Sequence, residues 1–129
     1  MQSKTTLMKT TGLIAMLLAA GSVWAQSATT VYAVSYYEVV AANQATSAQS
    51  APAAIFANYK QAASKESGAV SIDVLSDQGR PNHFTMIEVW NDQDAYTRHL
   101  AAASAKQLTS AVTPWLAGPK DERLYSKFQ

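Results

Sequence analysis

The sequence predicts an α+β domain whose elements follow the order β-α-β-β-α-β and whose strands form one antiparallel sheet. Two kinds of pattern support this order. The strand segments carry apolar residues at a period of two, and two helical segments carry apolar stripes at spacings of three and four. A turn-rich segment, residues 76–82, joins the two central strands as a hairpin. We expect both helices to lie on one face of the sheet.

The first strand and the first helix flank a segment that lacks large apolar residues. Residues 29–40 are dense in β-branched and aromatic side chains, with Glu38 as the only charge, and predict a strand. Residues 41–51 are rich in Ala, Gln, Ser and Thr, and their state stays open between a loop and a helical lead-in. Residues 52–67 predict an amphipathic helix that ends at Gly68. Its apolar stripe consists of Ile55, Tyr59, Ala62 and Ala63.

The predicted hairpin is formed by residues 69–75 and 84–90. In its first strand Val70, Ile72 and Val74 alternate with polar residues, which indicates one buried face. In its second strand both faces carry large apolar groups, so neither is plainly exposed to solvent. One face holds Phe84, Met86, Glu88 and Trp90, and the other holds Thr85, Ile87 and Val89.

The second helical region follows the hairpin. Asn91 offers an N-cap oxygen, and acidic residues in the next turn predict a helix that begins at about Asp92. Its inward face is expected to hold Ala95, His99 and Ala103, which follow at helical spacing.

This second region extends to about residue 117, which is too long for one uninterrupted helix. Pro114 removes a backbone donor and clashes with the preceding turn, so we expect the interruption there. Gly118 and Pro119 end the region. Residues 123–128 alternate apolar and polar side chains and predict a short closing strand.

The N-terminus resembles a secretory signal. Lys4 and Lys9 precede a short apolar run at residues 13–20, and residues 23–25 supply small side chains at the positions that signal peptidase reads. We therefore expect cleavage after Ala25 and export to the periplasm or beyond, with residues 26–129 as one domain. The run is too short to span a bilayer comfortably, so no stable membrane anchor is expected, although an uncleaved anchor is the alternative.

Composition narrows the chemistry and the partners. The chain has no cysteine, which excludes disulfides, thiol catalysis and thiolate metal sites. The formal net charge of +1 includes Lys4 and Lys9, which leave with the signal segment on cleavage. The remaining domain is therefore expected to have no basic surface that could bind nucleic acid. A domain this small is marginally stable alone, and its sheet carries apolar residues that two helices cannot all cover. Those residues are Tyr32, Tyr36, Val70, Ile72, Phe84 and Trp90.

Four residues around the second helix carry a resemblance to a known family. The usual signature of the antibiotic-biosynthesis monooxygenase family is an apolar residue, Glu, any residue, Trp or Tyr, a short acidic turn, Ala, and a His one turn later. The chain resembles this signature at Glu88, Trp90, Ala95 and His99. The resemblance runs from about residue 31 to 128. It implies a ferredoxin-like fold that pairs into a dimeric α+β barrel, and an activity that uses molecular oxygen without flavin, haem or metal.

The resemblance also implies roles for the signature residues. His99 is the candidate base, helped by Glu88, and Trp90 joins them as a catalytic-site or pocket residue. Each has a structural alternative. His99 can be a half-buried histidine satisfied by Glu88 or a backbone carbonyl, and Trp90 can be an ordinary core aromatic. Glu88 needs a partner such as His99, Arg98 or Arg123 if it is buried, and it can be a structural ion pair at the dimer edge.

Other residues are candidates for contact with the substrate. Phe84, Met86 and Tyr37 are expected to form apolar walls, while Asn58 or Tyr96 would orient a substrate oxygen. The alternative is that each of these residues holds an ordinary core or surface position, which is the more common place for a tyrosine. No metal site is expected, because His83 and His99 sit on different elements without a partner at a recognised ligand spacing.

Together these features predict an exported homodimer that oxidises a small hydroquinone or polyketide-like aromatic with molecular oxygen and no cofactor. One alternative is a periplasmic dimer that binds a small molecule without reaction. A haem-degrading monooxygenase is another, but those relatives usually place an Asn on the first strand, and residues 29–40 contain none.

Overall fold

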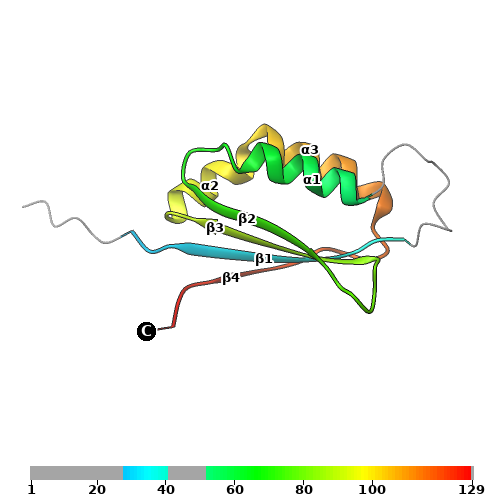
Figure 1. Cartoon of the computed structure of the whole chain (residues 1–129). Helices are drawn as coiled ribbons and strands as arrows, with labels where there is room; N and C mark the ends of the chain where they lie inside the picture. Colours follow the sequence, from blue (N-terminus) through cyan, green and yellow to red (C-terminus); the bar gives the residue numbers. More distant parts are fainter. Residues whose placement is uncertain (1–27, 41–51, 129) are drawn as a thin grey trace, which may run out of the picture.

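The structure, a computed structural model, describes residues 28–40 and 52–128 and has its helices on one face of a four-stranded antiparallel sheet (Figure 1). This arrangement confirms the predicted fold class. The elements are β1 (Val31–Glu38), α1 (Pro52–Ala63), β2 (Ala69–Ser76), β3 (His83–Trp90), α2 (Gln93–Ala101), α3 (Ala103–Val112), the 3-10 turn η2 (Thr113–Trp115) and β4 (Asp121–Tyr125).

The sheet has the strand order β2-β3-β1-β4, so β3 and β1 form its centre. The period of two holds along β3, where Met86, Glu88 and Trp90 are buried under the helices. In β1 the buried positions are Val31, Ala33, Ser35 and Tyr37. The two central strands therefore supply the floor of the core, and Glu88 is a charged residue in the middle of that floor.

Helices α1 and α3 lie side by side above the sheet (Figure 1). Helix α1 buries Ile55, Phe56, Tyr59 and Ala63, and α3 buries Leu108 and Val112. Ala62, expected on the stripe, is exposed, and Phe56 takes its place in the core. The buried face of α1 is therefore rotated slightly from the predicted one.

The second helical region divides at a position that the sequence does not signal. Ala102 adopts an extended backbone and its N–H bonds the His99 carbonyl, which separates α2 from α3. The expected interruption at Pro114 is also present, because α3 ends at Val112 and Pro114 lies in the 3-10 turn η2. The change of direction at Ala102 also leaves Ala103 exposed rather than inward.

Three boundaries and one buried position differ from the predicted ones. The N-cap of α2 is Asp92, whose carboxylate accepts from the Ala95 N–H at 2.7 Å, and not Asn91. Helix α1 ends at Ala63 rather than at residue 67, and turns continue to Gly68. An irregularity in the β2–β3 register between residues 69 and 71 leaves Val70 exposed. The closing strand spans residues 121–125 instead of 123–128.

The sheet face opposite the helices is not covered by any described segment. Tyr36 and Leu75 are about half exposed there, beside Val34 and Ile87, whereas Ile72 and Trp90 are buried on the helix side. The predicted signal segment and residues 41–51 lie outside the described residues. No helix within residues 28–40 and 52–128 is long and apolar enough to cross a membrane.

Candidate active site

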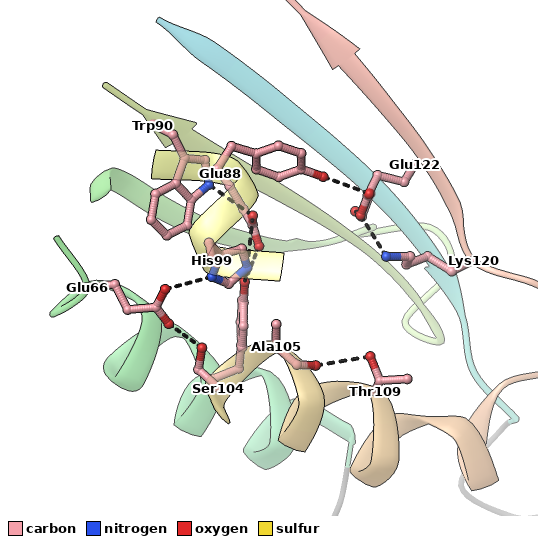
Figure 2. Close-up of polar contacts among 12 residues, drawn as sticks. Glu66, Glu88, Trp90, His99, Ser104, Ala105, Thr109, Lys120 and Glu122 are labelled. Carbon is pink, nitrogen blue, oxygen red and sulfur yellow. Dashed lines mark hydrogen bonds and ion pairs between the residues drawn. The ribbon is translucent and has the colours of Figure 1, made fainter. Parts of the chain in front are cut away.

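The imidazole of His99 is bonded on both of its nitrogens by residues from α1 and the turn after it. Nδ1 lies 2.8 Å from Oε2 of Glu66, and Nε2 lies 2.9 Å from the hydroxyl of Tyr59 (Figure 2). Trp90 stacks on the ring, with centroids 4.4 Å apart and planes 23° apart. His99 is 4% exposed. The ring is therefore fixed by contacts on both edges and one face.

Glu88 is the second buried ionisable group of the site. It is 4% exposed and accepts hydrogen bonds from the Tyr59 hydroxyl and, at 3.2 Å, from the Trp90 indole N–H. Its Oε2 lies 3.7 Å from Nε2 of His99, beyond a normal hydrogen bond. Tyr59 thus bridges the Glu88–His99 pair that the sequence predicts.

Local structure explains why these side chains meet. The alternation of β3 points Glu88 and Trp90 toward the helices, and the Asp92 cap starts α2 so that His99 faces them two turns later. Gly68 has a φ of 93°, and a Cβ there would collide with the Cβ of Ala95. The left-handed turn at Gly68 therefore lets the chain that carries Glu66 pass directly beside α2.

Sequence reasoning missed Glu66, Ser104 and the role of Tyr59. Glu66 lies after α1, and its other oxygen accepts from the Ser104 hydroxyl of α3 (Figure 2). Tyr59 was placed on the inward stripe of α1, but nothing in the sequence said which strand residue it meets. Its place on the predicted inward stripe was the one signal available.

A cavity of about 400 Å³ opens between the sheet and α3, beside this network. Five predicted residues line it: Tyr37, Met86, Glu88, Tyr96 and His99. Leu108, Val112 and Leu116 supply apolar walls. An apolar cavity with a few polar groups is the usual form of a small-molecule site.

Three predicted residues do not line this cavity. Trp90 is fully buried behind His99 and acts on the site through its contacts with His99 and Glu88. Phe84 packs on Phe56, with ring centroids 4.8 Å apart, away from the cavity. Asn58 is exposed on α1, because the inward position belongs to its neighbour Tyr59, and it therefore lies outside this cavity.

A second carboxylate, Glu122 of β4, also lines the cavity. It accepts from Tyr96 at 2.8 Å, from Ser35 at 2.9 Å and from the Lys120 ammonium at 2.6 Å (Figure 2). Burial acts to raise its pKa, but these hydrogen bonds outweigh burial and hold the pKa of the Glu122 carboxyl below its ordinary value. Glu122 is therefore an ionised, cation-paired group at neutral pH.

The phenols near the cavity stay protonated. Burial, followed by the charge of Glu88, raises the pKa of Tyr59 far above its ordinary value, and burial with the charges of Glu88 and Glu122 does the same for Tyr37. Burial and the bond to Glu122 raise the pKa of Tyr96. These hydroxyls can donate and accept hydrogen bonds but not serve as phenolates.

The arrangement suits proton transfer within an apolar pocket. It holds a buried carboxylate, a buried imidazole and a hydroxyl between them, next to a space for a small molecule. Among the described residues, no three His, Cys, Asp or Glu side chains are grouped so as to hold a metal ion.

Comparison with known proteins identifies relatives of this chain. The family model described as antibiotic biosynthesis monooxygenase matches residues 35–109. Among curated proteins none matches. Several solved structures share the fold.

A protein from Nitrosomonas europaea is 18% identical over 78% of this chain and 91% of its own, with a TM-score of 0.67. SnoaB from Streptomyces nogalater, a cofactor-independent oxygenase, is 24% identical over 79% of this chain and 96% of its own, with a TM-score of 0.63. Rv0793 from Mycobacterium tuberculosis is 15% identical over 78% of this chain and 97% of its own, with a TM-score of 0.66.

Proposed function

Since this chain belongs to the antibiotic biosynthesis monooxygenase family, we propose that it oxidises a small hydroquinone or polyketide-like aromatic with molecular oxygen and without a cofactor. The observation that carries the proposal is the buried Glu88, which lines an apolar cavity and is joined through Tyr59 to His99. SnoaB, a cofactor-independent oxygenase of the same fold, supports it. Fold alone does not determine reaction, so the chemistry of the cavity carries the argument.

The substrate supplies the electrons in this reaction. Removal of a phenolic proton makes an electron-rich anion that can pass one electron to oxygen, and the resulting radical pair joins to form a carbon–oxygen bond. The peroxide then loses water to leave a carbonyl. For a hydroquinone with a free ring position, the substrate and one O₂ become a hydroxyquinone and one water, so no external reductant is needed. The protein must bind, deprotonate and shield the substrate.

The cavity divides these tasks among its walls. Met86 and the apolar side chains of α3 exclude water, while Glu88 and His99 accept the phenolic proton of the substrate. Tyr37 and Tyr96 present phenols that can hydrogen-bond a substrate oxygen. Glu88 and Glu122 line the same cavity and both can accept hydrogen bonds, which suits a substrate that carries two hydroxyl groups.

Oxygen uptake tests this proposal. The purified, chelator-treated protein is mixed with a panel of hydroquinones and anthrones in an oxygen electrode, and products formed under ¹⁸O₂ are weighed by mass spectrometry. We expect one O₂ consumed per substrate and one labelled oxygen in the product. Tight binding of the same compounds without oxygen uptake would instead favour a non-catalytic binding protein.

We further propose that the protein acts as a homodimer joined through the open sheet face. The half-exposed Tyr36 and Leu75 on that face support this, because a sheet that carries apolar side chains on both sides gains stability when a second copy covers it. Light scattering at micromolar concentration measures the state. A stable monomer there would contradict the dimer.

We also propose export with cleavage after Ala25, on the strength of the lysine-flanked apolar run. Mass spectrometry of the N-terminus of protein recovered from the periplasm and from the cytosol is the test. Full-length protein in the cytosol would rule out this localisation.

A further inference from the structure

His99 has no ring nitrogen free to meet a substrate. Nδ1 is bonded to Glu66 at 2.8 Å, Nε2 to the Tyr59 hydroxyl at 2.9 Å, and Trp90 covers a ring face. A base must come within hydrogen-bond reach of the proton that it removes. In this geometry His99 can receive a proton only through one of its two bonded neighbours.

Tyr59 is the neighbour that leads toward the cavity. Its hydroxyl lies between Nε2 of His99 and Oε1 of Glu88, and Glu88 lines the cavity. A hydroxyl can accept one proton and donate another at the same time. Because burial and the charge of Glu88 raise its pKa, Tyr59 remains a hydroxyl and can pass a proton without being ionised.

We propose that Glu88 accepts the substrate proton and that Tyr59 relays it to His99, with Glu66 as the residue that positions His99 and balances its charge. This proposal rests on the monooxygenase function proposed above. It makes Glu88 the group that contacts substrate, Tyr59 the relay and His99 the place where the proton is held.

The transfer balances without any electron movement. The substrate O–H bond breaks and its proton forms an O–H bond on Glu88. That proton moves to the Tyr59 oxygen as the former Tyr59 proton moves to Nε2, so Glu88 is again a carboxylate and His99 carries two ring protons. The positive charge then faces Glu66, whose other oxygen accepts from Ser104. The same path returns the proton when the peroxide forms.

Glu66 is a positioning residue in this scheme because it acts only through His99. Its bond to Nδ1 sets the neutral tautomer, with the proton on Nδ1 and none on Nε2. The single Tyr59 hydrogen points to Glu88 while Glu88 is a carboxylate, and it can turn to Nε2 once Glu88 has taken the substrate proton. Without that bond the ring can adopt the other tautomer, in which Nε2 no longer accepts. Ser104 in turn holds the Glu66 carboxylate in place.

The first test reads the relay without any reaction. In the full-length protein with ¹⁵N-labelled histidine, NMR reports the hydrogen bonding of each ring nitrogen of His99. We expect Tyr59→Phe to change the Nε2 resonance and Glu66→Gln to change the Nδ1 resonance, while Tyr125→Phe, at an exposed phenol of β4, changes neither. An Nε2 resonance that is the same in Tyr59→Phe and in the original protein would overturn the relay.

The second test uses substrate acidity. With hydroquinone, Tyr59→Phe should lower kcat by roughly 10²-fold or more while KM changes little, as is usual when a proton path is lost. With 2,3,5-trifluorohydroquinone, which keeps one free ring position and has far more acidic hydroxyls than hydroquinone, the loss should fall below about tenfold, because the proton leaves much more readily. Equal losses with both substrates would mean that Tyr59 is only structural.

Glu66→Gln provides the same comparison if Tyr59→Phe fails to fold, and it should show a smaller but similarly acidity-dependent loss. Failure of the wider function is distinguishable from failure of the relay. An original protein that consumes no oxygen with any quinol would contradict the monooxygenase proposal, while the NMR test would still report on the relay.

Discussion

Two glutamates line the same cavity, and each accepts a hydrogen bond from a tyrosine, yet their surroundings differ. Glu88 sits on a central strand, is 4% exposed, and has Tyr59 and the Trp90 indole as donors. Glu122 sits on the edge strand β4 and is paired with the Lys120 ammonium at 2.6 Å. Its carboxylate charge is already balanced by a lysine, whereas the group nearest to Glu88 that can become positive is His99.

This difference separates proton transfer from binding. A carboxylate beside a fixed ammonium is held ionised and gains little from a further proton, so Glu122 is suited to accept a hydrogen bond from a bound hydroxyl. Glu88 instead connects to an imidazole through a hydroxyl, which gives an accepted proton somewhere to go. Substitutions at Glu88 and at Glu122 should therefore affect different steps, proton transfer and substrate binding.

The largest effect is expected from Glu88→Gln measured beside Glu122→Gln. Gln keeps the shape and can still accept hydrogen bonds, but it cannot take a proton, so Glu88→Gln should lower quinol turnover by about 10²- to 10⁴-fold. Glu122→Gln should lower it by less than about tenfold, mostly through KM, because a neutral hydrogen bond replaces a charged one. Oxygen-electrode kinetics on both variants decides, and equal losses would remove the distinction.

Removal of His99 should affect both activity and folding. His99→Ala is expected to cut turnover by about 10²- to 10⁴-fold and to cost about 1 to 3 kcal/mol of unfolding free energy, because Glu66 and Tyr59 lose a buried partner. His83→Ala is the matched control, since His83 lies partly exposed 3.7 Å from Glu38 and should change stability by less than about 0.5 kcal/mol. Oxygen-electrode kinetics measures the turnover of each variant, and urea unfolding measures the change in unfolding free energy of each. A stable, fully active His99→Ala protein would contradict the role of His99 altogether.

Backbone geometry near Glu66 can be tested without touching an ionisable group. Gly68→Ala puts a side chain on a φ of 93° and against Ala95, so it should cost about 2 kcal/mol or more and lower turnover as the Glu66 turn shifts. Gly118→Ala is the control, because a Cβ there meets nothing within 4 Å, and it should leave stability unchanged or raise it by up to about 1 kcal/mol. Thermal unfolding that gives equal shifts for both variants would argue against the tight contact.

The Glu88 side of the site was largely predictable from sequence. The period of two along β3 and the helical spacing to His99 brought Glu88, Trp90 and His99 together, since these patterns depend on local geometry. The partners from other elements were not predictable. Glu66 is 33 residues from His99 along the chain and Tyr59 is 29 from Glu88, and contacts at such separations are set by packing.

Two positions show what local patterns lack. The break between α2 and α3 falls at Ala102, inside a run of alanines that carries no proline, glycine or strong cap, and after it α3 packs along α1. Asn58 has an amide that could orient a substrate, but the register of α1 points its neighbour Tyr59 inward. In both places the tertiary contacts determine the local structure, because intrinsic helix propensity does not distinguish between the possibilities.

The smallest expected effect is the pH dependence of the stability that Glu122 contributes to the fold. Because the folded pKa of Glu122 lies below its unfolded value, which is near 4.3 for a glutamate, its hydrogen bonds stabilise the fold above that value and are lost as pH falls through the folded pKa. Glu122→Gln should therefore lower stability slightly at pH 7, by less than about 1 kcal/mol because the group is partly solvated. The difference from the original protein should begin to shrink as pH falls toward about 4.3 and should vanish only below the folded pKa of Glu122. Urea unfolding of both proteins from pH 7 to pH 3 measures it, and a difference that stays constant over this range would mean that Lys120 and Tyr96 do not stabilise the ionised carboxylate.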